Sequence, residues 1–461
     1  MTGIRAFRER VDPVKVRSRQ LKSGREKEFL LFRCYFVTPA FSAGFYIFRP
    51  NGGQGFFAKT CGSRNSVCCK ITQKWGVGQM GEESLKQHIR FMSRALELAA
   101  LGKGKTSPNP MVGAVVVRDD VIIGEGYHMK AGTPHAEVHA LRAAGDLAKG
   151  STLYVTLEPC CHYGKTPPCT EAIIKAGIQK VVIATCDPNP LVAGKGIRSL
   201  KEAGIEVQVG IMEEEAQRLN EAFFKYIRTG LPYVVLKVAM SLDGKIATCS
   251  GDSKWITGEK ARLKVQHLRA ESDAVMVGIG TVLADDPLLT VRLPDESKRP
   301  LRVIVDSSLH LPVDSRLVQT AGEAPVVVAA VPGKYQKDKK LLLEKRGVEV
   351  LDMPGEDDMV SIEELLQELG RRGVMTLLLE GGATLNASAL QADIVDKFVF
   401  FLSPLIIGGK NAPGAFGGSG FDTLDKALRL ESLKIERVGE DFLISGYPAG
   451  RRVIDTCSRV L

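Results

Sequence analysis

One histidine, one glutamate and two cysteines in this chain have the types and spacing of a catalytic zinc site. His135 and Glu137 share one short motif, and Cys160 and Cys169 share a second. Imidazole and thiolate are ligands that Zn²⁺ prefers, and three protein ligands leave a fourth position open for water. Glu137 is not needed as a ligand, so it is free to move protons. We therefore predict His135, Cys160 and Cys169 as metal ligands and Glu137 as the catalytic residue.

This combination of ligands with a proton-shuttling glutamate is the signature of zinc-dependent nucleobase deaminases. Zinc lowers the pKa of bound water from 15.7 toward roughly 7, which makes the water nucleophilic at neutral pH. The attack would fall on a ring carbon that bears an exocyclic amine. Glu137 would take the water proton and return protons to the ring and to ammonia. The interval from Cys160 to Cys169 is longer than in that signature, which restricts the chain to a smaller group of these deaminases.

A closed structural zinc site is the alternative interpretation. It would use Cys161 or Cys186 as a fourth ligand, but a closed site has no use for an acid two residues after its histidine. His139 lies one helical turn from His135, a spacing that can share a metal. We expect His139 to pack or to face the substrate instead, and His128 and His162 are further candidate ligands.

Helices and strands alternate around these residues, which predicts a mixed sheet covered on both faces. Helices are expected at 88–101, 137–144, 170–176, 197–203 and 213–228, and strands at 111–117, 121–126, 152–157, 180–185 and 206–209, with a hairpin turn at 118–120. Cys160 then follows a strand, whereas His135 and Cys169 stand at the starts of two helices. Such starts converge at one edge of an α/β sheet, where active sites form.

A second α/β series follows Gly230-Leu231-Pro232, where glycine and proline end a helical pattern. Strands are expected at 233–240, 274–277, 301–305, 326–330, 374–379 and 397–402, and helices at 258–270, 337–345 and 361–371. Two glycine-rich turns, at 278–281 and 380–384, each follow a strand and could bring backbone N–H groups close to phosphate. Neither is a full dinucleotide fingerprint, so each by itself could be a plain strand-to-helix turn.

The composition is that of an ordinary enzyme with two or three domains. The chain has 461 residues, of which 44% are hydrophobic and 25% charged, and no apolar run approaches the roughly 18–20 residues of a membrane span. We predict a leader at 1–79, a first domain at 80–229, a second domain at 230–450 and a tail at 451–461.

The leader carries the basic charge of the chain. It holds 15 Lys/Arg against 4 Asp/Glu, and because the net charge is +9, the remainder carries −2. The high pI is therefore no argument that the body binds nucleic acid. The leader lacks periodicity, so we expect a start assigned too far upstream of Met80, with an organelle transit peptide as the alternative. The cysteines of the body are not spaced as a disulfide framework, which favours a reducing compartment.

Several motifs of the first domain resemble the deaminase domain of the bifunctional riboflavin-biosynthesis deaminase/reductases. They are Thr106-Ser-Pro-Asn109-Pro-Met-Val-Gly113, His135-Ala-Glu137-Val-His139, Thr156-Leu-Glu-Pro-Cys160-Cys-His-Tyr-Gly-Lys165-Thr-Pro-Pro-Cys169, Asp187-Pro-Asn189-Pro and Val192-Ala-Gly194-Lys-Gly196. The long interval to Cys169 distinguishes this family from cytidine and tRNA adenosine deaminases. The resemblance implies that Asn109 lies at the pyrimidine and that Lys165 meets the ribose phosphate, although Lys165 could equally be a solvated loop lysine. Cys161 stands where the family often has serine.

The second half resembles the reductase domain of the same family. The matching motifs are Met240-Ser-Leu-Asp243-Gly-Lys245, Trp255-Ile-Thr257, Ala284-Asp285-Asp-Pro-Leu-Leu289-Thr-Val-Arg292, Val305-Asp-Ser307 and Glu380-Gly-Gly-Ala383. The resemblance implies NADPH contacts at Ala239, Trp255, Thr281, Asp285, Ser307, Gly382, Ala383, Thr384, Leu385, Asn386, Ala387 and Ser388. It implies substrate contacts at Ser253, Arg269, Leu289, Arg292 and Glu380. Arg269 and Arg292 offer planar forks suited to phosphate, although each could be a surface ion-pair residue. Trp255 could cover the nicotinamide or belong to the core, and Asp243 or Glu380 is our candidate general acid.

The resemblance covers about residues 84–446 and implies an α/β fold class, with a cytidine-deaminase-like three-layer α/β/α domain followed by a dihydrofolate-reductase-like α/β domain. The function it implies is deamination of a phosphoribosylaminopyrimidine, followed by NADPH-dependent reduction of its ribosyl group. We expect Zn²⁺ and NADPH as cofactors, small-molecule partners, no nucleic acid, no membrane and a cytoplasmic location, and the sequence leaves a homo-oligomer open. A deaminase with an inactive reductase half, and a nucleic-acid-binding or editing protein, are the alternative hypotheses. An inactive reductase is disfavoured because Asp243, Asp285, Arg292 and Glu380 are all present. A nucleic-acid-binding protein is disfavoured because the chain after the leader carries a net negative charge.

Overall fold

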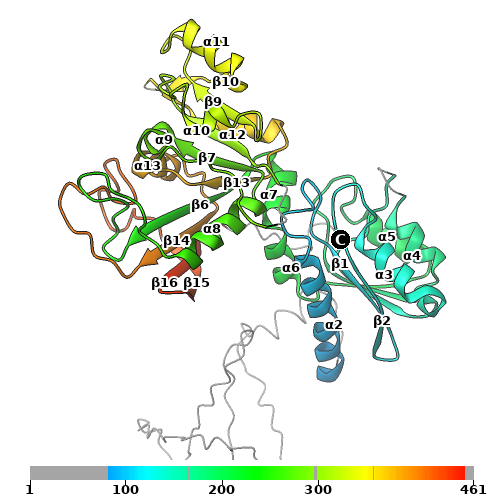
Figure 1. Cartoon of the computed structure of the whole chain (residues 1–461). Coiled ribbons are helices and arrows are strands. Elements are labelled where there is room, and N and C mark those ends of the chain that lie inside the picture. Colours follow the sequence, from blue (N-terminus) through cyan, green and yellow to red (C-terminus); the bar gives the residue numbers. More distant parts are fainter. Residues whose placement is uncertain (1–80, 164–166, 295–297, 357, 452–461) are drawn as a thin grey trace, which may run out of the picture. The chain divides into compact units, whose positions relative to one another are not determined.

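The computed structural model describes residues 81–163, 167–294, 298–356 and 358–451 (Figure 1). The predicted leader at 1–79, Lys165 and the tail beyond residue 451 lie outside this part of the chain. The described residues form one five-stranded sheet, one nine-stranded sheet and a small two-stranded sheet. None of their helices is long and apolar enough to cross a membrane.

The five-stranded sheet has the order β2-β1-β3-β4-β5. Its strands are β1 (Gly113–Arg118), β2 (Val121–Tyr127), β3 (Thr152–Leu157), β4 (Lys180–Thr185) and β5 (Glu206–Val209). Strand β1 pairs antiparallel with both β2 and β3, whereas β3, β4 and β5 run parallel. The predicted hairpin is confirmed, because Asp119 and Asp120 both have positive φ values, of 49° and 61°, as a tight type I′ turn requires.

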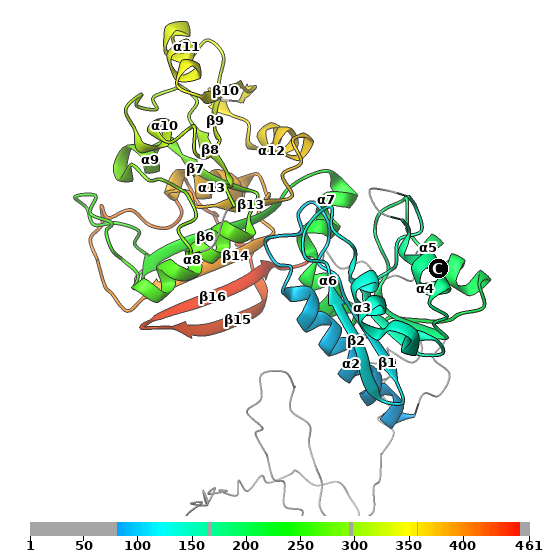
Figure 2. The same ribbon diagram turned by 45° about the vertical axis from the view of Figure 1, so that its right-hand side comes forward.

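Helices cover both faces of this sheet (Figure 2). They are α2 (Glu82–Ala100), α3 (Ala136–Ala144), α4 (Cys169–Lys175), α5 (Lys195–Glu202), α6 (Glu213–Leu219) and α7 (Glu221–Thr229). Because side chains alternate along a strand, Val115 and Val117 pack with α2 on one face, while Ala114 and Val116 pack with α3 on the other. The expected three layers of helix, sheet and helix are confirmed.

The single helix expected at 213–228 is wrong, because the structure breaks it into α6 and α7 at Asn220. The backbone of Asn220 leaves helical geometry, with φ −110° and ψ 24°. Its side-chain amide donates to the Met111 carbonyl at 2.8 Å and accepts from the Met111 N–H at 2.8 Å. An asparagine that pairs with distant backbone competes with helix continuation, and this tertiary contact is not visible in the local periodicity.

The nine-stranded sheet has the order β10-β9-β8-β7-β13-β6-β14-β16-β15. Its strands are β6 (Tyr233–Ser241), β7 (Ala274–Gly278), β8 (Leu301–Val305), β9 (Val326–Ala330), β10 (Val348–Asp352), β13 (Thr376–Leu379), β14 (Lys397–Ser403), β15 (Leu430–Val438) and β16 (Asp441–Pro448). The first seven strands in this order, β10 through β14, run parallel to one another. At the edge of the sheet, β16 pairs antiparallel with β14, and β15 pairs antiparallel with β16. The two-stranded sheet pairs β11 (Gly355–Glu356) with β12 (Met359–Val360).

All six strands expected in the second half are present, but β10, β11, β12, β15 and β16 were not predicted. Strand β15 lies at the edge of the sheet, and most of its side chains are exposed. Leu433 and Ile435 alternate with charged residues and are themselves exposed. Such a strand has no buried run that would distinguish it from a loop, so its pairing with β16 depends on tertiary context.

Helices also cover both faces of the larger sheet. They are α8 (Glu259–Glu271), α9 (Ile279–Asp285), α10 (Arg316–Gln319), α11 (Lys337–Lys345), α12 (Ile362–Arg371) and α13 (Ala383–Gln391). Apolar side chains of α12 and α13 share a core on one face, and those of α9, α10 and α11 share a core on the other. Strand β13 is inserted between β7 and β6, so the chain order reverses there. Helices α9 and α13 begin directly after β7 and β13, at the edge where a crevice is expected.

We predict that Gly113→Ala destabilises the first domain. A Cβ atom at position 113 would lie 1.9 Å from the Ala95 carbonyl oxygen of α2, so helix and sheet must separate. The cost should be about 1–3 kcal/mol, the usual range for overpacking. Urea unfolding followed by circular dichroism should show an earlier transition for this domain. Gly322→Ala is the control, since nothing lies within 4 Å of its added Cβ, and an unchanged midpoint for Gly113→Ala would contradict the prediction.

Candidate active sites

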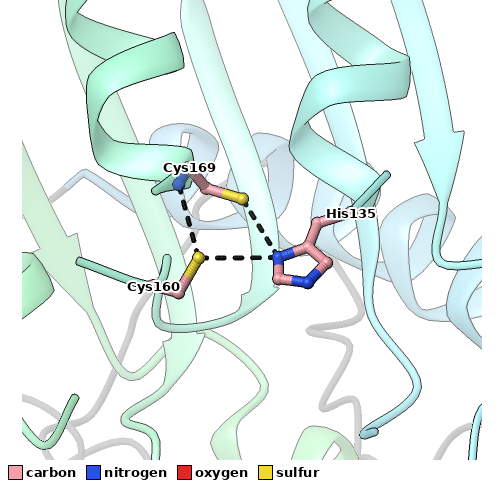
Figure 3. Close-up of side chains that lie close together, drawn as sticks. All are labelled: His135, Cys160 and Cys169. Carbon is pink, nitrogen blue, oxygen red and sulfur yellow. Dashed lines mark hydrogen bonds between the residues drawn. The ribbon is translucent and has the colours of Figure 1, made fainter. Parts of the chain in front are cut away.

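Three ligand atoms converge at one edge of the five-stranded sheet (Figure 3). His135 is the residue before α3, Cys160 lies in the loop after β3, and Cys169 is the first residue of α4. The imidazole and the two sulfur atoms all lie within 4.8 Å of one another. The His135 Nδ1 atom is 3.2 Å from the Cys169 sulfur and 3.5 Å from the Cys160 sulfur. One imidazole and two thiols at this spacing suit Zn²⁺ with an open fourth position.

Contacts between the two cysteines shift the pKa values of their thiols in opposite directions. The Cys169 backbone N–H donates to the Cys160 sulfur at 3.3 Å, and the contacts of Cys160 with Cys169 and His135 lower the pKa of the Cys160 thiol. The nearby Cys160 side chain, together with burial, raises the pKa of the Cys169 thiol. Because Zn²⁺ binds the thiolate form of cysteine, both thiols would have to be deprotonated to hold it.

Glu137 lies in the first turn of α3, beside these ligands. Its side chain is buried, and burial, with the charge of Cys160, raises its pKa to about 7. Its Oε2 atom is buried and makes no hydrogen bond within the described residues. A buried carboxylate oxygen without a protein partner fits a group that exchanges a proton with a water or substrate at the open metal position.

A cavity of about 370 Å³ opens onto His135, Glu137 and Cys160. Asn109 lines it, and its contact with the pyrimidine stays a prediction. The Asn109 amide lies 3.0 Å from Nε2 of the buried His128, whose Nδ1 is 3.3 Å from the Pro134 carbonyl oxygen. His128 therefore orients Asn109 and is not one of the clustered ligand atoms.

The wall residues that were not predicted as site residues include Asp187, Asn189 and Phe223. Asp187 and Asn189 follow β4, the strand next to β3, and carboxyl ends of parallel strands meet at one edge. That rule could have found them. Burial raises the pKa of Asp187 to about 7. Phe223 comes from α7, far along the chain, and no local pattern indicated it.

The loop that carries Cys160 is fixed by the neighbouring Glu158. The carboxylate of Glu158 accepts hydrogen bonds from the backbone N–H groups of Asp187, Gly194 and Ile197, at 3.0 to 3.2 Å. It thereby ties this loop to the start of α5. Gly196 permits the close approach, because a Cβ there would lie 2.1 Å from the Pro159 carbonyl oxygen.

The other candidate ligands do not join the cluster. Within the described residues, the metal-type group contains His135, Cys160 and Cys169 and no fourth member. Cys161 points its sulfur toward the Leu191 carbonyl at 4.0 Å, and Cys186 packs in the core under α3 and α5. His162 lines the cavity, whereas His139 is not among the lining residues. These positions favour a three-ligand site over a closed one.

The larger sheet holds a cavity of about 790 Å³ at the starts of α9 and α13. Of the predicted NADPH and substrate residues, eight line it: Ser253, Thr281, Asp285, Gly382, Ala383, Thr384, Leu385 and Ser388. The Ser253 hydroxyl donates to the Asp285 carboxylate at 2.9 Å. The size of this cavity suits a dinucleotide. So do the two helix starts beside it and its position where the order of the strands reverses.

The remaining residues predicted to bind NADPH do not line this cavity. Ala239 packs beside α8, and Ala387 is buried in α13. Trp255 is 67% exposed, with the Arg262 guanidinium 4.6 Å from its ring centroid. The Ser307 hydroxyl accepts from the N–H of Val360, which does line the cavity. Asn386 is buried and donates to the Ala415 carbonyl at 2.9 Å. Their predicted contacts stay predictions.

Glu380 forms a buried ionic cluster with two cations. Arg269 binds both its carboxylate oxygens, at 2.6 and 3.1 Å, and Lys237 of β6 lies 3.4 Å away. Burial alone would raise the pKa of Glu380, but Arg269 and Lys237 outweigh burial and lower it to about 2. Glu380 therefore stays ionised, which argues against its candidate role as general acid. Lys237 was not predicted, because a lysine inside a strand pattern carries no distinguishing signal.

The Arg269 guanidinium is therefore paired with Glu380, whereas Arg292 makes no ion pair within the described part of the chain. Burial and the nearby charges of Arg269 and Arg316 lower the pKa of Arg292, as expected for a cation that lacks an anion. Leu289, three residues earlier, is buried with a positive φ of 55°. Of the two predicted arginines, Arg292 is the better candidate for a substrate phosphate.

Comparisons with known proteins match both halves of the described chain. Residues 85–185 match the family model of the cytidine and deoxycytidylate deaminase zinc-binding region, and residues 232–444 match that of the RibD C-terminal domain. The chain is 49% identical over 358 residues to the riboflavin biosynthesis protein RibD of Bacillus amyloliquefaciens, covering 78% of this chain and 95% of the relative. RibD of Escherichia coli strain K12 is 43% identical over 363 residues, covering 76% and 96%.

Solved structures are similar to most of the chain. Form 1 of Acinetobacter baumannii RibD aligns with a TM-score of 0.71 at 45% identity and covers 79% of this chain and 99% of its own. The deaminase/reductase of Thermotoga maritima, named for diaminohydroxyphosphoribosylaminopyrimidine and 5-amino-6-(5-phosphoribosylamino)uracil, aligns with a TM-score of 0.70 at 39% identity and the same coverage.

Fold and sites together define a zinc-type deaminase domain joined to a dinucleotide-dependent reductase domain, which confirms the predicted fold class. The likeness covers both halves at high identity. The chain belongs to the RibD family of riboflavin biosynthesis. It is accordingly a bifunctional enzyme, both hydrolase and oxidoreductase, with Zn²⁺ and NADPH as its cofactors.

We predict that Cys169→Ser removes bound zinc, whereas Cys161→Ser leaves the zinc content unchanged. The sulfur of Cys169 lies within the ligand cluster, and that of Cys161 does not. A serine hydroxyl is a poor substitute for thiolate at such a site. Metal analysis of the two purified variants tests this. Zinc loss from Cys161→Ser would show that the site is closed by a fourth thiolate.

We predict that Glu380→Gln destabilises the second domain in a pH-dependent way. The folded pKa of Glu380, about 2, is below its ordinary value of 4.5, so its stabilising effect is complete above pH 4.5 and is lost as pH falls toward 2. At pH 7 the substitution leaves Arg269 and Lys237 unpaired and should cost about 3–5 kcal/mol.

Urea unfolding at several pH values measures this difference, which should shrink below pH 4.5. Glu440→Gln is the control, because residue 440 is exposed. A difference that stays constant down to pH 3 or grows on acidification would contradict the assignment of Glu380 as the ionised partner.

Proposed function

We propose that this chain deaminates diaminohydroxyphosphoribosylaminopyrimidine to 5-amino-6-(5-phosphoribosylamino)uracil and then reduces the ribosyl group to ribityl with NADPH. The observation that carries the proposal is the convergence of three ligand atoms beside Glu137, in a cavity that Asn109 also lines. The names of the Thermotoga maritima relative support the substrate and the order of the steps. We assign deamination to residues 80–229 and reduction to residues 230–450.

In the deaminase, His135, Cys160 and Cys169 would hold Zn²⁺, which when bound supplies the Lewis acidity that activates water. Glu137 takes the proton of the attacking water and delivers protons to the ring nitrogen and to the leaving ammonia. Its buried position and raised pKa suit a group that must alternate between two protonation states near neutral pH. Asn109, held by His128, orients the pyrimidine by hydrogen bonds.

In the reductase, NADPH supplies the hydride when bound, and the residues of the chain orient it. The starts of α9 and α13, at Thr281 and Gly382, offer backbone N–H groups to its phosphates. Arg292 binds the substrate phosphate, and Arg269 acts through Glu380 by holding its carboxylate in place. Ser253 would contact the substrate and Asp285 would contact NADPH; both line the cavity and are hydrogen-bonded to each other.

The proposed partners are small phosphorylated pyrimidines. The bacterial relatives support a location in the cytoplasm.

We predict that Glu137→Gln lowers ammonia release by roughly 10²–10⁴-fold, the usual contribution of a positioned acid–base group. The amide keeps the shape of the side chain but cannot carry the proton. Zinc content should be unchanged, since Glu137 is not among the clustered ligands. NADPH oxidation with the deaminated intermediate as substrate should also be unchanged.

Ammonia release, zinc content and NADPH oxidation are measured on one preparation of residues 80–461. Glu171→Gln is the matched control, an exposed glutamate on the first turn of α4. Loss of both activities in Glu137→Gln would contradict two separate sites. Failure of the wild-type protein to release ammonia from the proposed substrate would refute the substrate.

A further inference from the structure

The turn after β6 is fastened to a distant loop that contributes to the cofactor cavity. Residues 405–417, named here the 405–417 loop, follow β14, whereas the turn at Asp243-Gly244-Lys245 follows β6. Ile246 and Ala247 of the turn segment and Pro413 of the loop all line the cavity of about 790 Å³. The cavity wall therefore depends on how these two segments are joined.

Asp243 joins them through its carboxylate. Oδ1 accepts from the Ser241 hydroxyl at 2.6 Å and from the Ile407 N–H at 3.1 Å, and Oδ2 accepts from the Gly408 N–H at 2.7 Å. Hydrogen bonds to an ionised acceptor are shorter and stronger than neutral ones. The three donors lower the pKa of Asp243 to about 2, so the carboxylate stays ionised and accepts at neutral pH.

Backbone and lysine contacts continue the junction along the loop. The Lys245 ammonium donates to the Ala412 carbonyl at 2.8 Å. The Ile246 N–H donates to the Pro413 carbonyl at 3.0 Å, and the Ala415 N–H donates to the Gly244 carbonyl at 3.2 Å. Gly244 has a φ of +78°, which is favourable for glycine and strained for other residues.

The far end of the loop is fastened to α13. The Gly417 N–H donates to the Ala383 carbonyl at 2.9 Å, and the Asn386 amide donates to the Ala415 carbonyl at 2.9 Å. Ala383 lines the cavity, whereas Asn386 is buried behind it. The loop is thus held between the turn after β6 and the start of α13, which lines the cavity.

We propose that Asp243 and Lys245 are positioning residues that hold the 405–417 loop as one wall of the NADPH site, and that Asp243 is not the proton donor of the reduction. The proposal rests on the proposed assignment of this cavity to NADPH. A carboxylate that already accepts three hydrogen bonds at neutral pH has no proton to give. Asn386 has the same positioning role from the other side of the loop.

The test compares Asp243→Asn and Lys245→Met with wild-type protein. Both should raise the KM and the Kd for NADPH about tenfold, the change that corresponds to one charge-assisted hydrogen bond. The kcat at saturating NADPH should change by less than about threefold, a small fraction of what loss of an acid–base group costs. The dependence of kcat on pH should keep its shape.

Asp422→Asn is the matched control, an exposed aspartate between the 405–417 loop and β15 that lies 3.8 Å from the Lys426 ammonium. Its NADPH affinity should match that of wild type. Calorimetric titration with NADPH gives Kd directly, and ammonia release by each variant reports that the first domain is intact. Should Asp243→Asn fail to fold, Lys245→Met carries the test alone.

Two outcomes would overturn the proposal. A kcat for Asp243→Asn reduced by roughly 10² or more, with unchanged NADPH affinity and a lost limb in the pH profile, would make Asp243 a proton donor. Unchanged Kd for both variants would show that the loop does not shape the cofactor site. Wild-type protein that fails to bind NADPH would instead refute the assignment of the cavity, which separates that failure from failure of this proposal.

Discussion

The convergence of His135, Cys160 and Cys169 is the constraint on which the deaminase domain depends. Their ligand atoms come from three separate segments, yet they lie within 4.8 Å of one another. Two helices must therefore begin at one sheet edge, and the loop after β3 must end between them. Glu158 fixes that loop through three backbone N–H groups, and Gly196 lets α5 approach it closely. Glu158 and Gly196 therefore help to fix the position of the Cys160 sulfur.

The site of the reductase domain is also formed by distant segments of the chain, but it has no clustered metal ligands. Its cavity is made by helix starts at the point where the order of the strands reverses, and by a loop that follows β14. Charged side chains here hold other parts of the protein in place. Arg269 and Lys237 keep Glu380 ionised and oriented, and Asp243 accepts hydrogen bonds from the 405–417 loop. Neighbouring groups of the protein therefore fix the positions of Glu380 and Asp243 and keep both carboxylates ionised without a bound ligand.

The sequence predicted the site of the first domain better than that of the second. His135, Glu137 and the two cysteines lie in short motifs whose chemistry is specific, so their roles could be inferred from residue type and spacing. Arg269 and Arg292 looked equivalent in the sequence. The structure separates them, because the Arg269 guanidinium binds both oxygens of Glu380 and Arg292 has no such partner in the described residues. An ion pair between α8 and the residue after β13 has no signature in the local sequence.

The sequence by itself determined the zinc chemistry, the alternation of helices and strands and the two-domain order, because these follow from side-chain types and local periodicity. Only the tertiary structure decided which residues surround the sites. Asn220 breaks a helix to pair with the Met111 backbone, and Phe223 then reaches the deaminase cavity. Strands β15 and β16 complete a sheet although their own pattern is weak. Contacts between distant segments depend on how the whole chain packs, and local propensity carries no information about them.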